Sequence, residues 1–139
     1  MTKKEVFAVL DCYYSQGGNF IDTANNYQSG QSETYLGEWL SSPPSLRDQM
    51  VVATKYSFVQ TAFLGYDGTT IHSNYGGNGT KSLRLSVEAS LKKLQTTYID
   101  ILYVHWWDFT TSIPELMLSL NTICEQGKVI YLGISDTPS

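Results

Sequence analysis

The sequence predicts an α/β protein built around a parallel sheet, and two observations lead to this fold class. Segments with helical spacing of apolar residues alternate four times with short segments of strand length that are almost wholly apolar. These short segments lack the polar alternation of a half-exposed strand, which indicates strands covered on both faces. Such alternation favours parallel strands joined by right-handed helical crossovers.

The first helix is expected directly after Thr2, because Thr2 and Glu5 have the spacing of a capping box. Apolar residues follow at helical spacing until Gly17 ends the helix. Residues 19–22 are then predicted to form a short strand. A polar loop comes next, and Ser32 is expected to cap the second helix, which a serine- and proline-rich segment ends.

The middle of the chain contains two strands separated by a long loop. Residues 51–55 are expected to form the second strand. Residues 56–80 include five glycines, which is typical of a loop that is either functional or disordered. A third helix is predicted over residues 81–95 and a third strand over residues 98–105.

The last unit begins at Ser112, which with Glu115 forms a second capping-box pattern. Gly127 is expected to end this helix, and residues 129–135 form the fourth strand. Two architectures fit four such units. One is a (β/α) barrel, of which this chain would supply about half, since a complete barrel has ~250 residues. The other is an open doubly wound sheet.

The composition is that of one globular domain. The chain has 139 residues, 42% of them hydrophobic, and a net charge of −4 with scattered basic residues, so we expect no nucleic-acid binding. It has no apolar targeting segment and no run near the ~20 apolar residues of a membrane span, so we expect no membrane association and a cytoplasmic protein. Cys12 and Cys124 have no metal-site spacing, so we expect two buried thiols and no metal.

Polar side chains stand where all four predicted strands end. They are Asp22, Lys55, His105 and the pair Ser135 and Asp136. In parallel α/β folds, ligands bind at the carboxyl ends of the strands, because side chains of neighbouring units meet there. Each residue alone is more often structural, as a turn residue, a solvated charge or a satisfied histidine. Their recurrence on four consecutive strands favours a functional site.

This combination of side chains suits the reduction of a carbonyl group by hydride transfer. The developing alkoxide needs a proton donor, and a phenol has an ordinary pKa of ~10, so a nearby cation must favour its ionised form. We expect Tyr27 to donate the proton and Lys55 to provide the positive charge. Asp22 is expected to hold the lysine by an ion pair. His105 is expected to hydrogen-bond the substrate oxygen.

Four segments resemble the aldo-keto reductase superfamily: "GGNFIDTANNYQSGQSETYLGEWL", "VVATK", "YIDILYVHWWD" and "IYLGISDTP". The His-Trp-Trp-Asp and Ser-Asp-Thr-Pro variants resemble its fungal aryl-alcohol dehydrogenase branch. The resemblance implies a partial (β/α)8 TIM barrel of about four βα units with a parallel sheet. It also implies a catalytic tetrad, which falls on Asp22, Tyr27, Lys55 and His105.

The resemblance further implies NADPH as the cofactor, bound without a glycine-rich Rossmann motif. The nicotinamide end would contact Asp22, Ser135 and Asp136. Most of the family has asparagine where this chain has Asp136, and an ionised aspartate cannot donate a hydrogen bond as an amide does.

The substrate implied by the resemblance is a small aromatic aldehyde or alcohol. Its pocket would be lined by Tyr27, His105, Trp106 and Trp107. The expected reaction is a reversible, NADP(H)-dependent hydride transfer between aromatic aldehydes and alcohols.

Family barrels also include a first strand before Thr2 and about three βα units beyond Ser139. The resemblance therefore implies that residues 1–139 form a single incomplete barrel domain, truncated at both ends, without the segment that grips the cofactor phosphate and with weakened NADPH binding. One alternative is a catalytically inactive relative that self-associates through its open sheet edges. Another is a non-catalytic binding subunit that pairs with a full-length relative. For turnover by this chain alone, the missing strands favour the inactive alternative.

Overall fold

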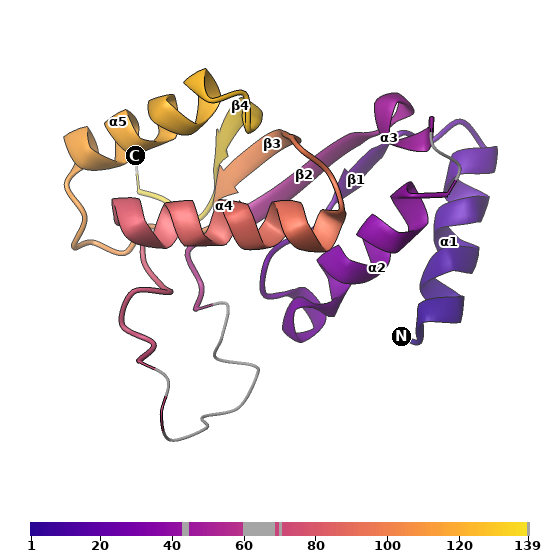
Figure 1. The fold of residues 1–139 in the computed structure, drawn as a ribbon, viewed down its shortest axis with the longest axis horizontal. Coiled ribbons are helices and arrows are strands. Elements are labelled where there is room, and N and C mark those ends of the chain that lie inside the picture. Colours follow the sequence, from indigo (N-terminus) through magenta and orange to yellow (C-terminus); the bar gives the residue numbers. More distant parts are fainter. Residues whose placement is uncertain (43–44, 60–68, 70, 139) are drawn as a thin grey trace.

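The computed structural model describes residues 1–42, 45–59, 69 and 71–138, which form an α/β fold with one parallel sheet (Figure 1). The strand order follows the sequence, and each strand pairs in parallel with the next. The strands are β1 (Phe20–Asp22), β2 (Val51–Tyr56), β3 (Ile99–Val104) and β4 (Val129–Ile134). The described sheet is not closed, and β1 and β4 are its outer strands. The predicted fold class, part of a TIM barrel, is confirmed.

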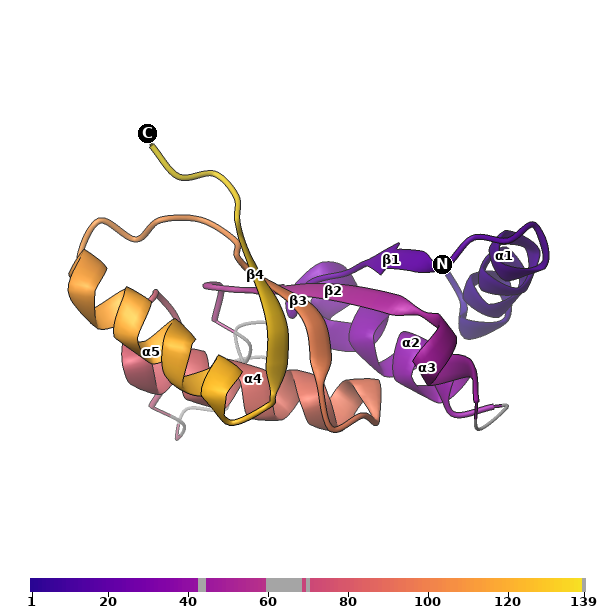
Figure 2. The same ribbon diagram turned by 90° about the horizontal axis from the view of Figure 1, so that it is seen from above.

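Helices α2, α4 and α5 lie on one face of the sheet, while α1 lies beside β1 at one end (Figure 2). In the described part of the chain, the opposite face carries no helix. The helices are α1 (Lys3–Ser15), the 3₁₀ turn η1 (Tyr27–Gly30), α2 (Gln31–Leu40), α3 (Leu46–Gln49), α4 (Thr80–Leu94) and α5 (Ile113–Glu125).

The first predicted capping box is confirmed, because Thr2 and Glu5 bond reciprocally at the start of α1. The second is formed only in part. Ser112 accepts a hydrogen bond from the N–H of Glu115, as expected. The Glu115 carboxylate, however, accepts from the backbone N–H and the hydroxyl of Thr80, at 3.2 and 3.0 Å. It therefore joins the start of α5 to the start of α4.

The predicted cap of the second helix is wrong. The N-cap of α2 is Gly30, with φ of 83°, and not Ser32. The 3₁₀ turn η1 leads directly into α2, so Ser32 already lies inside the helix. Its hydroxyl instead bonds the Thr23 hydroxyl at 2.8 Å and ties α2 to the end of β1.

The hydrophobic core fills the space between the sheet and the three helices α2, α4 and α5. A close approach between α2 and α4 helps to form it, because a Cβ atom on Gly37 would overlap the backbone at Lys93. Side chains from the sheet and from the helices pack together in this core, as expected for close-packed interiors. The core includes Leu36, Trp39, Val52, Tyr56, Leu83, Val87, Leu102, Val104, Leu116 and Leu120.

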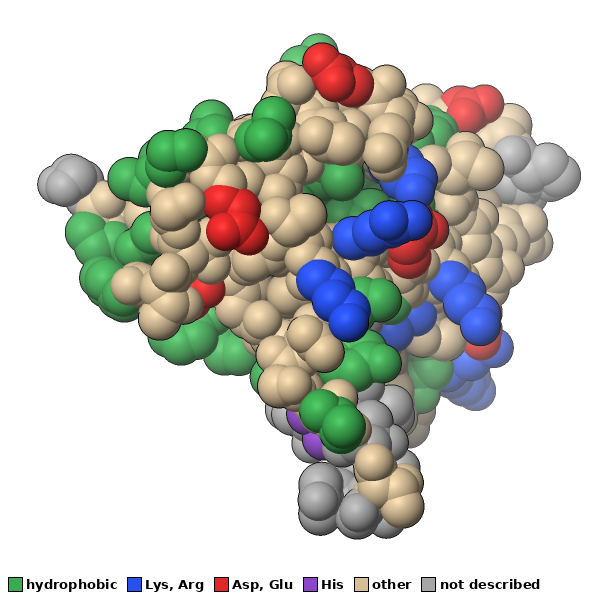
Figure 3. Space-filling view, turned by 60° about the vertical axis from the view of Figure 1, so that its left-hand side comes forward, with side chains coloured by type: hydrophobic (Ala, Val, Ile, Leu, Met, Phe, Trp, Pro, Cys, Tyr) green, Lys and Arg blue, Asp and Glu red, His purple; other side chains and the backbone are tan. Residues whose placement is uncertain are grey.

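The expectation that every strand is covered on both faces holds for β2 but is wrong for β4. Ile130, Tyr131, Leu132 and Ile134 are 41–67% exposed. The reason is that β4 is an outer strand and one face of the sheet carries no helix in the described residues. Figure 3, in which the α5 side of the molecule comes forward, shows hydrophobic side chains spread over that side.

The prediction of two buried thiols is also wrong for Cys12, which is exposed, while Cys124 is half-buried. No residue of α1 is fully buried, although Phe7 and Leu10 pack against the core. The helix covers only the edge of the sheet beside β1, which leaves most of its surface open.

The predicted loop over residues 56–80 lies partly outside the described residues, because 60–68 and 70 are not among them. Its first residue, Tyr56, completes β2 and is buried. Among the helices that the structure describes, none is long and apolar enough to cross a membrane.

Candidate active site

The Lys55 side chain is the centre of a polar cluster at the carboxyl end of the sheet. Its residue is buried near the end of β2, where the strand holds it between β1 and β3. The ammonium forms an ion pair with the carboxylate of Asp22 at the end of β1. It also donates to the carbonyl oxygen of Thr23 at 2.9 Å and to the hydroxyl of Tyr27 at 3.4 Å. Three acceptors therefore surround one cation.

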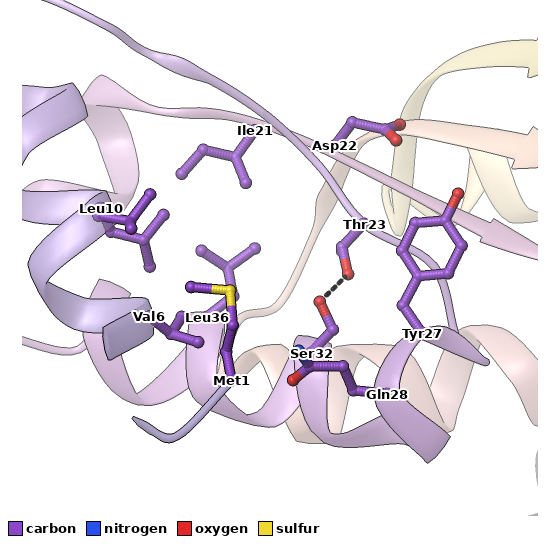
Figure 4. A pocket seen from close by; sticks show the side chains of 11 residues that line it. Met1, Val6, Leu10, Ile21, Asp22, Thr23, Tyr27, Gln28, Ser32 and Leu36 are labelled. Carbon is purple, nitrogen blue, oxygen red and sulfur yellow. Dashed lines mark hydrogen bonds between the residues drawn. The ribbon is translucent and has the colours of Figure 1, made fainter. Parts of the chain in front are cut away.

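Tyr27 reaches this cluster because the chain turns sharply after β1. The 3₁₀ turn that begins at Tyr27 has two residues with left-handed backbone angles, Gln28 and Ser29. Figure 4 shows the Tyr27 hydroxyl and the Asp22 carboxylate lying near each other at the same end of the view. Tyr27 stays 40% exposed, so its hydroxyl is accessible from outside the chain.

His105 follows β3, and its backbone N–H donates to the Tyr56 carbonyl at 2.8 Å. Its ring lies edge-on to the Tyr27 ring, with 5.9 Å between the ring centroids. Burial lowers the pKa of His105, and the positive charge of Lys55 lowers it further, although Asp136 and Asp22 partly offset these effects. The imidazole is therefore neutral at pH ~7. Its Nδ1 atom is buried without a hydrogen-bond partner in the described part of the chain.

Ser135 and Asp136 lie at the same end of the sheet, immediately after β4. The backbone N–H of Ser135 donates to the Val104 carbonyl at 2.9 Å, which continues the pairing of β4 with β3. Asp136 has a left-handed φ of 40°, and its charge acts on His105. Asp22 and this pair stand on the two outer strands of the sheet.

The structure separates the two tryptophans that follow His105. Trp106 is near the site and stacks on Phe58, with 5.5 Å between centroids and 16° between planes. Trp107 packs against the core and lines a different hollow of about 330 Å³, together with Phe109 and Met117. The grouping of both tryptophans in one pocket is therefore not what the structure shows.

A hollow of about 560 Å³ borders the cluster on the α1 side (Figure 4). Apolar residues such as Val6, Leu10 and Leu36 line one end, and Asp22 and Tyr27 line the other. Lys55 and His105 are not among its lining residues, so the hollow adjoins the reactive groups without containing them.

The model of the aldo/keto reductase family matches residues 1–139. The chain belongs to this family. Among its relatives, norsolorinic acid reductase B of Dothistroma septosporum is 58% identical over 138 residues, 99% of this chain and 34% of that protein. An aryl-alcohol dehydrogenase of Pestalotiopsis microspora is 55% identical over 139 residues, 99% of this chain and 35% of that protein.

The NADP(+) aryl-alcohol dehydrogenase of Phanerodontia chrysosporium is 51% identical over 139 residues, 100% of this chain and 36% of that protein. The chain thus spans about a third of the length of these relatives. The predicted resemblance to the aldo/keto reductases and to fungal aryl-alcohol dehydrogenases is confirmed.

In this aldo/keto reductase chain, Phe58 is a site residue that the sequence pattern did not predict. Phe58 lies edge-on to His105, with 5.0 Å between ring centroids, and stacks on Trp106. Its position three residues after Lys55 was the one available signal. A loop residue, however, has no periodic pattern from which its direction follows.

The implied nicotinamide cofactor fits the chemistry of this end of the sheet. Polar groups without partners gather there among the described residues, namely Nδ1 of His105 and the side-chain oxygens of Asn25 and Asn26. Buried polar atoms of this kind are normally paired, and a bound ligand is one way to pair them. Ser135 and Asp136, directly after β4, add polar atoms at the same end of the sheet. The described residues contain no group of three or more side chains suited to a metal ion.

Proposed function

We propose that this chain carries the reaction centre of an oxidoreductase that interconverts aromatic aldehydes and alcohols with NADP(H). The proposal rests mainly on one observation. The Lys55 ammonium donates hydrogen bonds to both the Asp22 carboxylate and the Tyr27 hydroxyl. The names of relatives support it, since two of those described above are named aryl-alcohol dehydrogenases and the name of one of these includes NADP(+).

The proton in this reaction comes from Tyr27. When bound, NADPH would supply a hydride to the carbonyl carbon and become NADP(+). The Tyr27 hydroxyl would donate its proton to the carbonyl oxygen as negative charge develops there. The Lys55 cation stabilises the phenolate that remains. Asp22 and the Thr23 carbonyl hold the ammonium in place. In the reverse direction the phenolate takes the proton of the alcohol.

His105 orients the substrate oxygen. Because its pKa is lowered, the imidazole is neutral and still donates one N–H. A neutral donor polarises the carbonyl without placing a second positive charge beside Lys55. The edge-to-face contact of the Tyr27 and His105 rings, with 5.9 Å between centroids, supports a shared action of both side chains on one substrate oxygen.

The nicotinamide end of the cofactor is proposed to contact Asp22, Ser135 and Asp136. As a carboxylate, Asp136 accepts a hydrogen bond from the amide N–H₂ of a carboxamide. The Ser135 hydroxyl can donate to the carboxamide oxygen.

Absorbance of NADPH, followed with purified chain and benzaldehyde, tests the proposed function. We expect slow oxidation of NADPH by the unaltered chain, in keeping with the weakened NADPH binding expected from the resemblance. The rate is expected to fall at least ~100-fold in Tyr27→Phe, which lacks the acidic hydroxyl. Tyr35→Phe, on α2 away from the cluster, serves as the matched control and is expected to keep the rate. Oxidation that is equal in Tyr27→Phe and the unaltered chain would contradict the proposal.

A second candidate property is self-association. We propose that residues 1–139 form a single incomplete barrel domain, two copies of which pair along the outer strands, β4 of one with β1 of the other. The exposed apolar side chains of β4 favour this pairing, because an unpaired edge with such side chains is a ready template for another strand. Parallel pairing of β4 with β1 would continue the order of the sheet.

A further inference from the structure

Asn78 is a fully buried asparagine in the loop that precedes α4. Its side-chain nitrogen donates to the Ser57 hydroxyl at 2.9 Å and to the Trp106 carbonyl at 3.1 Å. Its side-chain oxygen accepts from the backbone N–H of Asp108 at 2.7 Å. Both N–H bonds and the oxygen of this amide are therefore used, and they join the loops after β2 and β3.

Asp108 completes a reciprocal pair with Asn78. Its carboxylate accepts from the backbone N–H of Asn78 at 2.7 Å and from the backbone N–H groups of Thr110 and Thr111, both at 2.9 Å. Burial disfavours the charged form, but these hydrogen bonds outweigh burial and hold the pKa of Asp108 well below its ordinary value. The carboxylate thus stays ionised at neutral pH and remains an acceptor for these N–H groups.

The network converges on the carbonyl oxygen of Trp106, which accepts from Asn78 and also from the Ser57 hydroxyl at 3.2 Å. Because the backbone of Trp106 is held on this side, its indole ring is directed onto Phe58. The two stacked rings are 42% and 36% exposed, so they present open aromatic surface. Phe58 also contacts His105, which places this surface beside the reactive groups.

We propose that Asn78 is a positioning residue that acts through Trp106: it fixes the Phe58–Trp106 pair as a rigid aromatic wall and thereby sets the preference for planar aromatic substrates. The inference rests on the proposed function and adds the origin of its substrate preference. A wall that is already ordered loses little conformational entropy when a ligand binds, so its stacking contributes fully to affinity.

Two aldehydes of similar size test the proposal, 2-naphthaldehyde and its saturated analogue decahydronaphthalene-2-carbaldehyde. Ligand-observed NMR with the full chain gives a Kd for each. Asn78→Ala is expected to raise the Kd of the aromatic aldehyde about tenfold and that of the saturated aldehyde less than about twofold. Asn74→Ala, an exposed position in the same loop, is the matched control and is expected to change neither.

The indole N–H signal of Trp106, assigned with Trp106→Phe, provides a second measurement that needs no ligand. Asn78→Ala is expected to shift and broaden this signal and leave that of the buried Trp39 unchanged. Should Asn78→Ala not fold, Ser57→Ala removes one of the same hydrogen bonds and is expected to act in the same direction. The proposal would be overturned if the folded variants lost affinity for both aldehydes equally. An unchanged indole N–H signal of Trp106 in the folded variants would also overturn it.

The outcome also separates this inference from the proposed function. A chain that binds 2-naphthaldehyde in an Asn78-dependent way but does not oxidise NADPH supports the positioning role and contradicts the catalytic one. A chain that oxidises NADPH with equal preference for both aldehydes contradicts the positioning role alone. An unaltered chain that binds no aromatic aldehyde overturns both.

Discussion

The ammonium nitrogen of Lys55 lies 3.4 Å from the hydroxyl oxygen of Tyr27, and the same ammonium pairs with Asp22. These residues come from two neighbouring strands and the turn between β1 and α2. Parallel pairing of β1 with β2 brings Asp22 opposite Ala53, two residues before Lys55, so the carboxylate and the ammonium end at the same edge of the sheet.

Replacing Lys55 with methionine tests whether this cation supports proton transfer. The change keeps the length of the side chain and removes its charge, so the phenolate formed from Tyr27 would lose its stabilising partner. We expect kcat for aldehyde reduction to fall ~100-fold or more, measured as NADPH oxidation. Lys4→Met, at an exposed position of α1, is the control, and a kcat of Lys55→Met within about threefold of the unaltered value would contradict the role.

The lowered pKa of His105 makes stability depend on pH. A histidine of this kind binds its proton more weakly in the folded chain than in the unfolded chain. Its contribution to the free energy of unfolding is therefore complete above its ordinary pKa of ~6.5 and is lost as the pH falls below that value. Urea unfolding over a pH series should show a steeper loss below pH ~6.5 for the unaltered chain than for His105→Gln. Identical slopes for both chains would count against a lowered pKa.

Gly37→Ala is expected to destabilise the fold although alanine favours helices. A Cβ atom at this position would lie 2.6 Å from the carbonyl carbon of Leu94, inside the contact between α2 and α4. Overpacking against backbone costs about 3 kcal/mol, which exceeds the ~1 kcal/mol gained from helix propensity. Urea unfolding measures the difference. Gly79→Ala is the matched control, because its nearest contact would be the Glu115 carboxylate at 3.8 Å, and a loss there equal to that of Gly37→Ala would contradict the steric explanation.

Lys93→Met tests how much the ion pair between Lys93 and the buried Glu33 carboxylate stabilises the fold. This carboxylate is fully buried and accepts from the Thr54 hydroxyl at 2.7 Å and the Lys93 ammonium at 3.2 Å. Without Lys93 a buried charge loses its counter-ion. Breaking a buried pair costs ~3–5 kcal/mol, and we expect about 2 kcal/mol here because the Lys93 side chain is 26% exposed. Lys92→Met, one residue away and exposed, should leave the free energy of unfolding within about 0.5 kcal/mol.

Size-exclusion chromatography with light scattering tests the proposed self-association. We expect the unaltered chain to elute at the mass of two copies or more, and Tyr131→Lys to shift it toward one copy, because a charge on an outer strand opposes edge pairing. Glu125→Gln, on the exposed end of α5, also changes the net charge by +1 and is the control. A monomeric and cooperatively folded unaltered chain would exclude pairing through β4.

Much of the architecture follows from local patterns. Apolar runs such as that of β3 and the capping box at Thr2 have periodic or short-range signals, and the structure places these elements within a residue or two of their predicted bounds. The four polar residues Asp22, Lys55, His105 and Ser135 are at strand ends by the same logic. Parallel pairing then requires those ends to share one edge of the sheet, so their proximity was predictable.

Only the tertiary structure decided which further side chains lie at the site and which predicted ones pack elsewhere. Phe58 joins His105 and Trp106, Trp107 turns to the core, and Asn78 binds loops that are 21 to 30 residues away in the sequence. In a loop, no helical or strand periodicity predicts where a side chain points. The contacts of loop residues depend on how the neighbouring helices and strands pack. The sequence by itself determined which segments form strands and which reactive groups stand at their ends, because both follow from local patterning. The aromatic wall and the exposed face of β4 depend on long-range packing, which no local pattern encodes.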